Sequence, residues 1–226
     1  MKKVFRKEMK YPISILDFCR LRKRLECFVK PDPYSGDIGY CVRSLYFDTN
    51  GDRDLFDTLD GNLQKRKIRL RFYPPSVENI LLEYKCKSGN DVLKRSIKLS
   101  KEDALRIAGG DYRPLMGLQE PLALNLYTRL MTGGYHPKAI VEYKRLAYIY
   151  PVSNTRLTFD SLVSASYATG SFFDEDPGLI PVMETDLGVL EVKYDHFLVG
   201  ILKETIEEVD ALVQANSKYA QSRFLF

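Results

Sequence analysis

The sequence predicts an α+β fold, in which a closed or strongly curved antiparallel sheet has helices packed outside it. Several segments alternate charged and apolar side chains, which is the period of a β-strand. Short turn signals connect these segments as hairpins. Capping serines open stretches with one apolar helical face. The apolar strand faces would pack against the helices, and the charged faces would line an interior.

The first part of the chain alternates strands and short helices. Ser14, with Asp17 three residues on, is typical of a capping box that begins a helix. Asn50 is expected to cap a second helix, which Gly61 ends. The expected elements are a strand over 4–11, a helix from 14 to about 28, a strand over 40–48, a helix over 52–59 and strands over 65–73 and 80–87.

The rest of the chain continues this pattern. The turn at 88–91 predicts a hairpin, and Ser100 with Asp103 predicts a helix that ends at Gly109. No long linker, low-complexity tract or repeat is present, so a single domain over residues 1–226 is expected. The further elements are a strand over 92–99, helices over 100–109 and 121–131, strands over 139–150, 155–160 and 164–168, a hairpin of 179–185 with 188–194, a helix over 196–204 and an ambiguous tail.

Composition excludes several classes of protein. Of the 226 residues, 45% are hydrophobic and 28% charged, which favours a packed core over disorder. The 34 Lys and Arg against 30 Asp and Glu disfavour a general nucleic-acid binder. No apolar run reaches the length of a membrane span, and the charged N-terminus is not typical of a signal peptide. The four cysteines lack CxxC spacing, which indicates reduced thiols in a cytoplasmic protein.

Basic side chains gather on one face of the strand over 65–73. Lys67, Arg69 and Arg71 point one way, while Ile68 and Leu70 point the other. An interior lined by Lys and Arg needs an anionic ligand or water, because unpaired buried charge is costly. The same alternation recurs in four further segments: Arg6–Lys10, Leu81–Lys87, Arg156–Asp160 and Glu191–Asp195.

These segments, in this order, resemble the VTC-type polyphosphate polymerase domain of the triphosphate tunnel metalloenzyme superfamily. The superfamily signature is an N-terminal ExExK strand, which this chain carries as Arg6-Lys-Glu8-Met-Lys10. Arginine at the first position is typical of the polymerase branch. The other matching segments are Val42–Asp48, Lys67–Arg71, Leu82–Lys85, Val141–Arg145, Arg156–Asp160, Leu190–Lys193 and Ser217–Tyr219.

The resemblance implies an eight-stranded antiparallel β-barrel tunnel that holds triphosphate or polyphosphate together with Mn²⁺ or Mg²⁺. The metal ligands are expected to be Glu191 and Glu8. Arg43 and Lys87 have no firm family role, and Arg95 is an alternative to its neighbour Lys94. The residues expected to act in catalysis are Arg69, Arg71, Lys85, Arg145, Arg156 and Lys193. Those expected to bind substrate are Lys10, Arg43, Lys87, Lys94, Ser217 and Lys218.

The function implied by the resemblance is transfer of the γ-phosphate of ATP to a growing polyphosphate chain. Phosphoryl transfer needs positioning and charge stabilisation, which Arg, Lys and a carboxylate-bound cation supply. The same site with water as the acceptor would be a triphosphatase, and a site without turnover would be a polyphosphate-binding module. The protein would act in the cytoplasm, either alone or beside a separately encoded membrane partner.

Structural readings of some of these residues also remain open. Glu8 and Glu83 could simply neutralise neighbouring lysines on a crowded charged face. Asp160 and Asp195 fall at expected strand ends, where turn and cap residues are common. Ser217 could be a helix N-cap that presents backbone N–H groups to phosphate.

Overall fold

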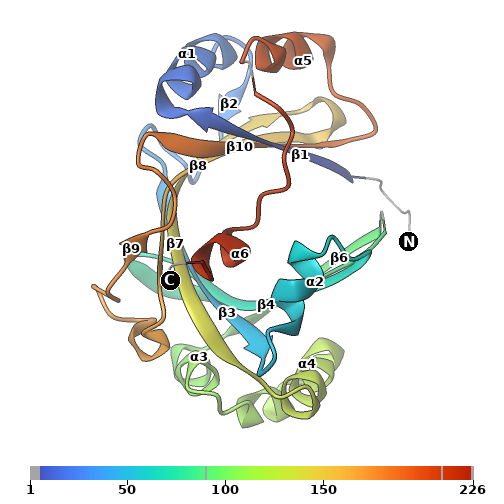
Figure 1. The fold of residues 1–226 in the computed structure, drawn as a ribbon, viewed down its shortest axis with the longest axis vertical. Helices are drawn as coiled ribbons and strands as arrows, with labels where there is room; N and C mark the ends of the chain where they lie inside the picture. The colour runs from blue at the N-terminus through green and yellow to red at the C-terminus, as the bar shows by residue number, and fades with distance from the viewer. Residues whose placement is uncertain (1–5, 90, 210, 225–226) are drawn as a thin grey trace. The chain divides into compact units, whose positions relative to one another are not determined.

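The computed structural model describes residues 6–89, 91–209 and 211–224, and its chain divides into two compact units (Figure 1). Two long strands, β7 (Tyr135–Tyr150) and β8 (Thr155–Ser166), contribute to both units. A single domain over residues 1–226 stays a prediction. Unit 1 comprises Met1–Cys41, Tyr143–Val163 and Met183–Asn216, and unit 2 comprises Val42–Glu142, Ser164–Val182 and Ser217–Phe226.

Eight strands follow the hydrogen-bonded order β1-β10-β8-β7-β3-β4-β5-β6. The pairs β1–β10, β10–β8, β3–β4, β4–β5 and β5–β6 are antiparallel, which confirms the predicted α+β class with an antiparallel sheet. The remaining strands of this path are β1 (Arg6–Ser14), β3 (Tyr40–Thr49), β4 (Gln64–Tyr73), β5 (Ser76–Ser88), β6 (Asp91–Leu99) and β10 (Leu187–Asp195).

In unit 1, helices α1 (Ile15–Leu25) and α5 (Gly200–Glu207) cover the apolar face of the strands (Figure 1). The Oγ of Ser14 accepts a hydrogen bond from the Asp17 backbone N–H at 3.0 Å, as the capping pattern predicts. Phe18 of α1 stacks on Phe159 of β8, with ring centroids 3.7 Å apart. The helix ends at Leu25, about three residues earlier than expected.

In unit 2, helices α3 (Lys101–Ala108) and α4 (Pro121–Thr132) and the 3-10 turn η1 (Arg113–Gly117) pack on the apolar face of the sheet (Figure 1). The register aligns Leu70, Leu82 and Ile97 in one buried row across β4, β5 and β6. Ser100 caps α3 through the Asp103 N–H at 3.0 Å, as predicted. These leucine and isoleucine side chains therefore fix which face of the strands is left for charge.

Helix α6 (Lys218–Ser222) lies on the other, charged side of unit 2. Its Tyr219 stacks on Tyr46 of β3 at a centroid distance of 5.0 Å. The Tyr219 hydroxyl donates to the Asp48 carboxylate at 2.8 Å. Since Tyr46 lies opposite Arg69 in the register, α6 is held against the basic face of β4.

The cap of α2 (Arg53–Leu59) differs from the prediction. Asn50 is not the N-cap, because Asp52 occupies that position with a φ of 53° and makes no side-chain cap bond. The Asp48 carboxylate caps the helix instead. It accepts hydrogen bonds from the backbone N–H groups of Asp54 at 2.9 Å and Leu55 at 3.0 Å. A buried carboxylate from the preceding strand satisfies the first turn, at a spacing that differs from that of a capping box.

Three further expectations were wrong in their details. The segments 155–160 and 164–168 form one strand, β8, which bends at Leu162, where φ is 52°. The short β9 (Ile180–Pro181) pairs with β8, so the predicted hairpin of 179–185 with 188–194 does not form. Helix α5 begins at Gly200 instead of residue 196. The elements not anticipated are β2 (Lys30–Pro31), η1, η2 (Val152–Asn154) and η3 (Thr169–Ser171).

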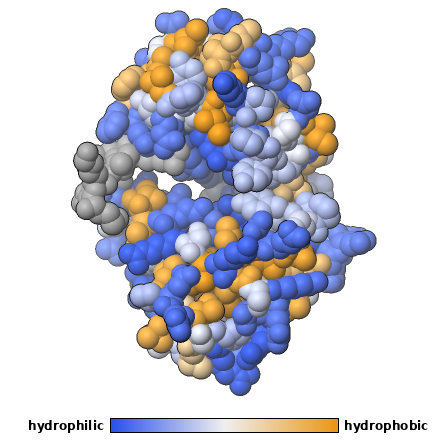
Figure 2. Space-filling view, turned by 180° about the vertical axis from the view of Figure 1, so that it is seen from behind, coloured by the Kyte–Doolittle hydropathy of each residue, from blue (hydrophilic) through white to orange (hydrophobic). Residues whose placement is uncertain are grey.

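Hydrophilic residues cover much of the face drawn in Figure 2. Among the described residues, none of the helices has both the length and the apolar character needed to cross a membrane.

A buried carboxyl in unit 2 makes stability depend on pH. Burial, together with the charge of Asp48, raises the pKa of Asp54 to about 7. Since its pKa in the unfolded chain is near 3.8, the folded state binds more protons between these values and stability falls as pH rises through them. We expect Asp54→Asn to be close to neutral at pH 5 and to stabilise the protein at pH 8 by up to about 2.6 kcal/mol. Urea unfolding of both proteins at the two pH values measures this, and a difference independent of pH would contradict it.

Candidate functional site

A cluster of alternating charges lies on the strands of unit 1. We name it the glutamate cluster, because Glu191 lies at its centre. Antiparallel neighbours directly opposite each other share a face. The register places Glu8 opposite Lys193, and Lys193 opposite Arg156. Its members are Glu8, Lys10, Arg145, Arg156, Asp160, Glu191 and Lys193.

Glu191 is buried among cations. Its carboxylate lies 2.7 Å from the Lys193 ammonium and 3.9 Å from the Arg145 guanidinium. Burial alone would raise its pKa, but the charges of Lys193 and Lys10 outweigh burial and hold the pKa of Glu191 well below its usual range. Glu191 is therefore ionised wherever the protein is folded near neutral pH.

Arg145 is held in place by Asp160. Its Nε and Nη2 donate to the two carboxylate oxygens at 2.6 and 2.7 Å, and Asp160 is fully buried. The guanidinium also lies over the Tyr143 ring, 5.2 Å from the centroid. Burial opposes the charged form, yet Tyr143 and Asp160 raise the pKa of Arg145 well above its usual value. A two-point carboxylate contact of this kind fixes the plane of the guanidinium.

Asp160 was expected to be a turn or cap residue, but it is buried within β8 and pairs with Arg145. Its position near an expected strand end suggested a turn or cap residue, but β8 continues six residues beyond it. The available signal was its alternation with Arg156 and Thr158 on one strand face.

The remaining members of the glutamate cluster have defined partners. The Lys10 ammonium lies 3.2 Å from Glu8 and donates to the Asn216 backbone carbonyl at 2.8 Å. Arg156 forms an ion pair with Asp32 at 2.8 Å. Glu8 therefore does neutralise a neighbouring lysine, as the structural reading of the sequence allowed.

A second cluster, the arginine cluster, lies on the charged face of unit 2. Its centre is Glu83 of β5, which is 2% exposed and shared by three cations. Arg69 contacts it at 2.7 Å, Arg71 at 3.4 Å and Lys94 at 2.7 Å. Burial would raise the pKa of Glu83, but Arg69 and Lys94 lower it, so it stays ionised. Because one carboxylate faces three cations, the arginine cluster keeps a net positive charge.

A row of lysines continues the arginine cluster. The register aligns Lys67 with Lys85, and Lys85 with Lys94. The Lys67 ammonium donates to the Oγ of Ser217 at 2.8 Å, and the same oxygen caps α6 through the Ala220 N–H at 3.2 Å. Ser217 is thus an N-cap, and it brings the start of α6, including Lys218, beside the lysine row.

Two donors on the charged face of unit 2 are buried without a hydrogen-bond partner among the described residues. They are the Nε of Arg71 and the hydroxyl of Ser44, which lies opposite Arg71 in the register. In unit 1 the Thr158 hydroxyl, which lies opposite Glu191, is also buried without a hydrogen-bond partner among the described residues. Orphaned buried donors are costly, and an anionic ligand with many acceptor oxygens would supply acceptors for donors on these faces.

Not every predicted residue belongs to a cluster. Arg43 was predicted to bind substrate, but it lies opposite Phe72 on the apolar side of β3 and is 4% exposed. It contacts Glu142 at 2.5 Å and the backbone carbonyls of residues 172, 174 and 175, so it braces this part of unit 2. Lys87 lies on the charged face toward the end of β5 and is exposed. Lys94 faces Glu83, whereas its neighbour Arg95 lies on the opposite face.

A divalent cation has two candidate ligands in the glutamate cluster. The Lys193 ammonium lies 2.7 Å from Glu191 and 3.8 Å from Glu8, so both carboxylates already stabilise positive charge between them. Within the described ranges, no group of three or more His, Cys, Asp or Glu side chains could hold a metal. Mg²⁺-type ions are commonly held by one or two carboxylates with the substrate phosphates, and these two residues fit that arrangement.

Comparison with solved structures supports the fold. A candidate adenylate cyclase from Bacillus halodurans shares 14% identity and a TM-score of 0.56, covering 100% of this chain and 98% of its own. A candidate adenylyl cyclase from Hippeastrum, with a dominant triphosphatase activity, shares 15% identity and a TM-score of 0.57, covering 96% and 94%. Among functionally curated proteins, no sequence matches this chain. The VTC domain family matches residues 5–226, and the chain therefore belongs to the VTC domain family.

Proposed function

We propose that this protein is an ATP-dependent polyphosphate polymerase, which transfers the γ-phosphate of ATP to the end of a polyphosphate chain. The observation that carries the proposal is the sharing of Glu83 by Arg69, Arg71 and Lys94. Excess positive charge on a half-buried strand face favours a ligand with repeated negative charge. Membership of the VTC domain family supports the same class of ligand.

Within the arginine cluster, the proposed role of each cation follows from its chemistry. Arg69 and Arg71 would bind phosphate oxygens through their planar N–H forks. Lys85, Lys94 and Lys218 would act as point charges. Ser217, as the N-cap of α6, would present backbone N–H groups of the first helical turn to phosphate. Because Glu83 holds Arg69 and Arg71 before the ligand arrives, little reorganisation is needed on binding.

Within the glutamate cluster, Arg145, Arg156, Lys193 and Lys10 would contact phosphate, while Glu191 and Glu8 would hold Mn²⁺ or Mg²⁺. When bound there, such an ion would help to balance the negative charge of the phosphates during transfer. Glu191 can take this role because its low pKa keeps it ionised. Asp160 keeps the Arg145 fork in one plane, so that its remaining N–H groups face one direction.

The proposed transfer is a single displacement. An oxygen of the terminal phosphate of polyphosphate attacks the γ-phosphorus of ATP, and the bond from that phosphorus to the β–γ bridging oxygen breaks. ADP leaves with the electron pair. The attacking phosphate is already ionised near neutral pH, so the cations need only align the two phosphates and stabilise the charge of the transition state.

An inorganic tripolyphosphatase or nucleoside triphosphatase is the second candidate. The dominant triphosphatase activity of the Hippeastrum protein favours it. Water would then replace the phosphate acceptor on the same cationic faces. Arg6, at the first position of the strand signature, counts against it by removing a carboxylate, although its side chain lies outside the described part of the chain. A binding module without turnover is the third candidate.

Incubation of the purified protein with γ-labelled ATP and Mn²⁺ separates the three candidates. A ladder of labelled polyphosphate with an equal release of ADP supports the polymerase. Orthophosphate as the sole labelled product would show a hydrolase, and tight binding of tripolyphosphate without any product would indicate a binding module. The R69Q/R71Q variant should lose the ladder, whereas R95Q, on the opposite face of the neighbouring strands, should keep it.

We further propose that the protein acts in the cytoplasm, and that any export of its product depends on a separately encoded membrane partner. Fractionation of cells that produce a tagged protein tests this proposal. Recovery in the membrane fraction only when such a partner is present would support the association.

A further inference from the structure

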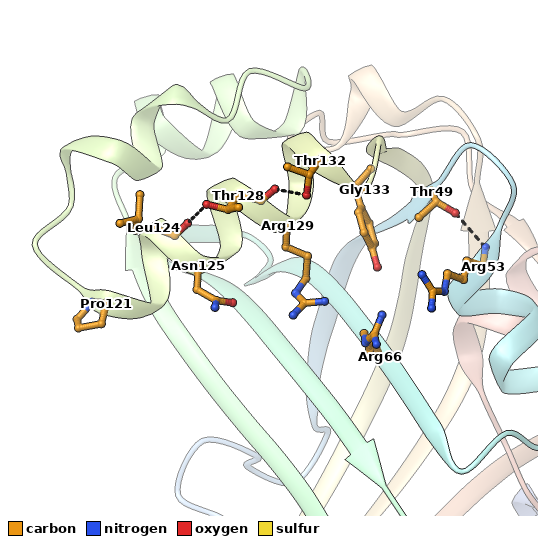
Figure 3. A pocket seen from close by; sticks show the side chains of 11 residues that line it. Thr49, Arg53, Arg66, Pro121, Leu124, Asn125, Thr128, Arg129, Thr132 and Gly133 are labelled. Atoms are coloured by element: carbon orange, nitrogen blue, oxygen red, sulfur yellow. Dashed lines mark hydrogen bonds between the residues drawn. The ribbon is translucent and has the colours of Figure 1, made fainter.

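A pocket of about 670 Å³ lies in unit 2, away from the charged strand face. Figure 3 shows Arg129 descending from α4, Arg66 rising from β4 and Arg53 extending from the start of α2. Arg66 belongs to the face of β4 opposite to Lys67 and Arg69, because successive strand residues alternate. The pocket is therefore distinct from the arginine cluster.

The three arginines have no carboxylate partner in the described part of the chain. Arg53, Arg66 and Arg129 form no ion pair there, although the chain forms many others. The carboxyl that interacts electrostatically with Arg66 is Asp54, which is buried and bonded to the Tyr135 hydroxyl at 3.0 Å. Asp54 alone does not balance three like charges, which repel one another, so an anion bound between them would stabilise the arrangement.

Arg129 is positioned by the fold and is not simply a solvated side chain. Its guanidinium lies over the Tyr84 ring at 5.3 Å, and its Nε is buried without a hydrogen-bond partner. Stacking on an aromatic ring holds the guanidinium plane while leaving its terminal N–H groups available. The site is thus partly organised before a ligand arrives.

Helix α4 supplies the rest of the wall. Asn125, Thr128, Arg129 and Thr132 follow the spacing of one helix face. The Thr128 and Thr132 hydroxyls donate to backbone carbonyls one turn earlier, at 3.0 and 2.8 Å, so their protons are engaged. The side-chain donors left for a ligand include the three guanidinium groups and the Asn125 amide.

Size and charge together indicate the ligand class. The volume falls within the range typical of small-molecule sites and exceeds what one orthophosphate would fill. Three arginines and an amide match a ligand with several phosphate oxygens, since guanidinium binds phosphate in a bidentate manner. The residues that contact the base or sugar of a nucleotide in such sites are commonly aromatic, and the aromatic side chain in the lining is Tyr135.

We propose that this pocket is a second binding site for a phosphoanhydride anion, separate from the charged strand faces. The anion is either a short inorganic polyphosphate or the triphosphate of a nucleotide, and both would present the same linked phosphates to Arg53, Arg66 and Arg129. The site stands on its own geometry and does not require the protein to be a polymerase.

Calorimetric titration is carried out in the R69Q/R71Q background, which weakens binding at the arginine cluster. The pocket is then tested by comparing this background with and without the pocket substitutions, since both keep the glutamate cluster. Tripolyphosphate and a non-hydrolysable ATP analogue are the two probes, each used with EDTA. We expect one molecule of at least one probe to bind, and the probe that binds more tightly identifies the source. Adding R53Q/R66Q/R129Q should weaken this binding at least tenfold.

A charge-matched control distinguishes a site from general attraction. The exposed Lys23, Arg95 and Lys101 lie outside the pocket and both clusters, so K23Q/R95Q/K101Q should change the affinity less than threefold. Thermal unfolding of each variant checks that it is folded. Absence of binding in the R69Q/R71Q background, or equal losses in the pocket and control variants, would overturn the proposal. Loss of polymerase activity alone would bear on the proposed function and not on this site.

Discussion

Replacing Glu191 by Gln should reduce turnover about 1,000-fold while leaving phosphate binding intact. Glu191 is the central, buried carboxylate of its cluster and remains ionised, so it is the best-placed ligand for a cation there. A bound cation contributes several kcal/mol to the stabilisation of phosphoryl charge, which corresponds to this loss of rate. Initial rates with ATP and Mn²⁺, for both proteins, measure the effect.

Binding of tripolyphosphate to the same variant separates a metal role from a direct one. Without a divalent ion, E191Q removes a negative charge near the ligand and should bind as tightly as the wild type or more tightly. With Mn²⁺, the wild type should gain affinity and E191Q should not. E8Q provides the milder comparison, since Glu8 is less buried than Glu191. Unchanged turnover in E191Q would refute the metal assignment.

Replacing Asp160 by Asn should lower kcat/KM about 100-fold, because Arg145 would lose the partner that fixes its orientation. Asn offers a single acceptor oxygen where Asp160 accepts from both Nε and Nη2. Small errors in the placement of a charged group are enough for a loss of this size. Breaking a buried ion pair should also cost about 3–5 kcal/mol of stability. Steady-state kinetics and urea unfolding of D160N measure the two effects.

E142Q is the matched control for this variant. Glu142 also pairs with a buried arginine, Arg43, but that pair lies outside both charged clusters. E142Q should therefore lose stability while its kcat/KM stays within about threefold of the wild type. If the two variants lose activity in proportion to their stability, Asp160 has only a structural role and the positioning assignment fails.

The alternation along β4 shows that local sequence can predict which face of a strand is buried. Ile68 and Leu70 are fully buried, and Arg69 and Arg71 share Glu83 on the other face, as the period of two predicts. Ser14 and Ser100 are the N-caps that their spacing indicates, and Ser217, for which a cap role was left open, is also an N-cap. Arg43, an additional candidate for substrate binding with no firm family role, lies on the apolar side of β3 and pairs with Glu142.

The sequence by itself determined the α+β class, the antiparallel pairing of its main strands, and which residues carry charge on alternate positions. These properties depend on side-chain period and local caps, which act over a few residues. Only the tertiary structure decided that Asp160 contacts Arg145, that Asp48 caps α2 from the end of the preceding strand, and that Arg66 and Arg129 share a pocket. The first and third of these join residues that strand register and helix packing bring together, and no local pattern encodes that distance. The Asp48 cap is local, but its spacing of six and seven residues differs from that of a capping box.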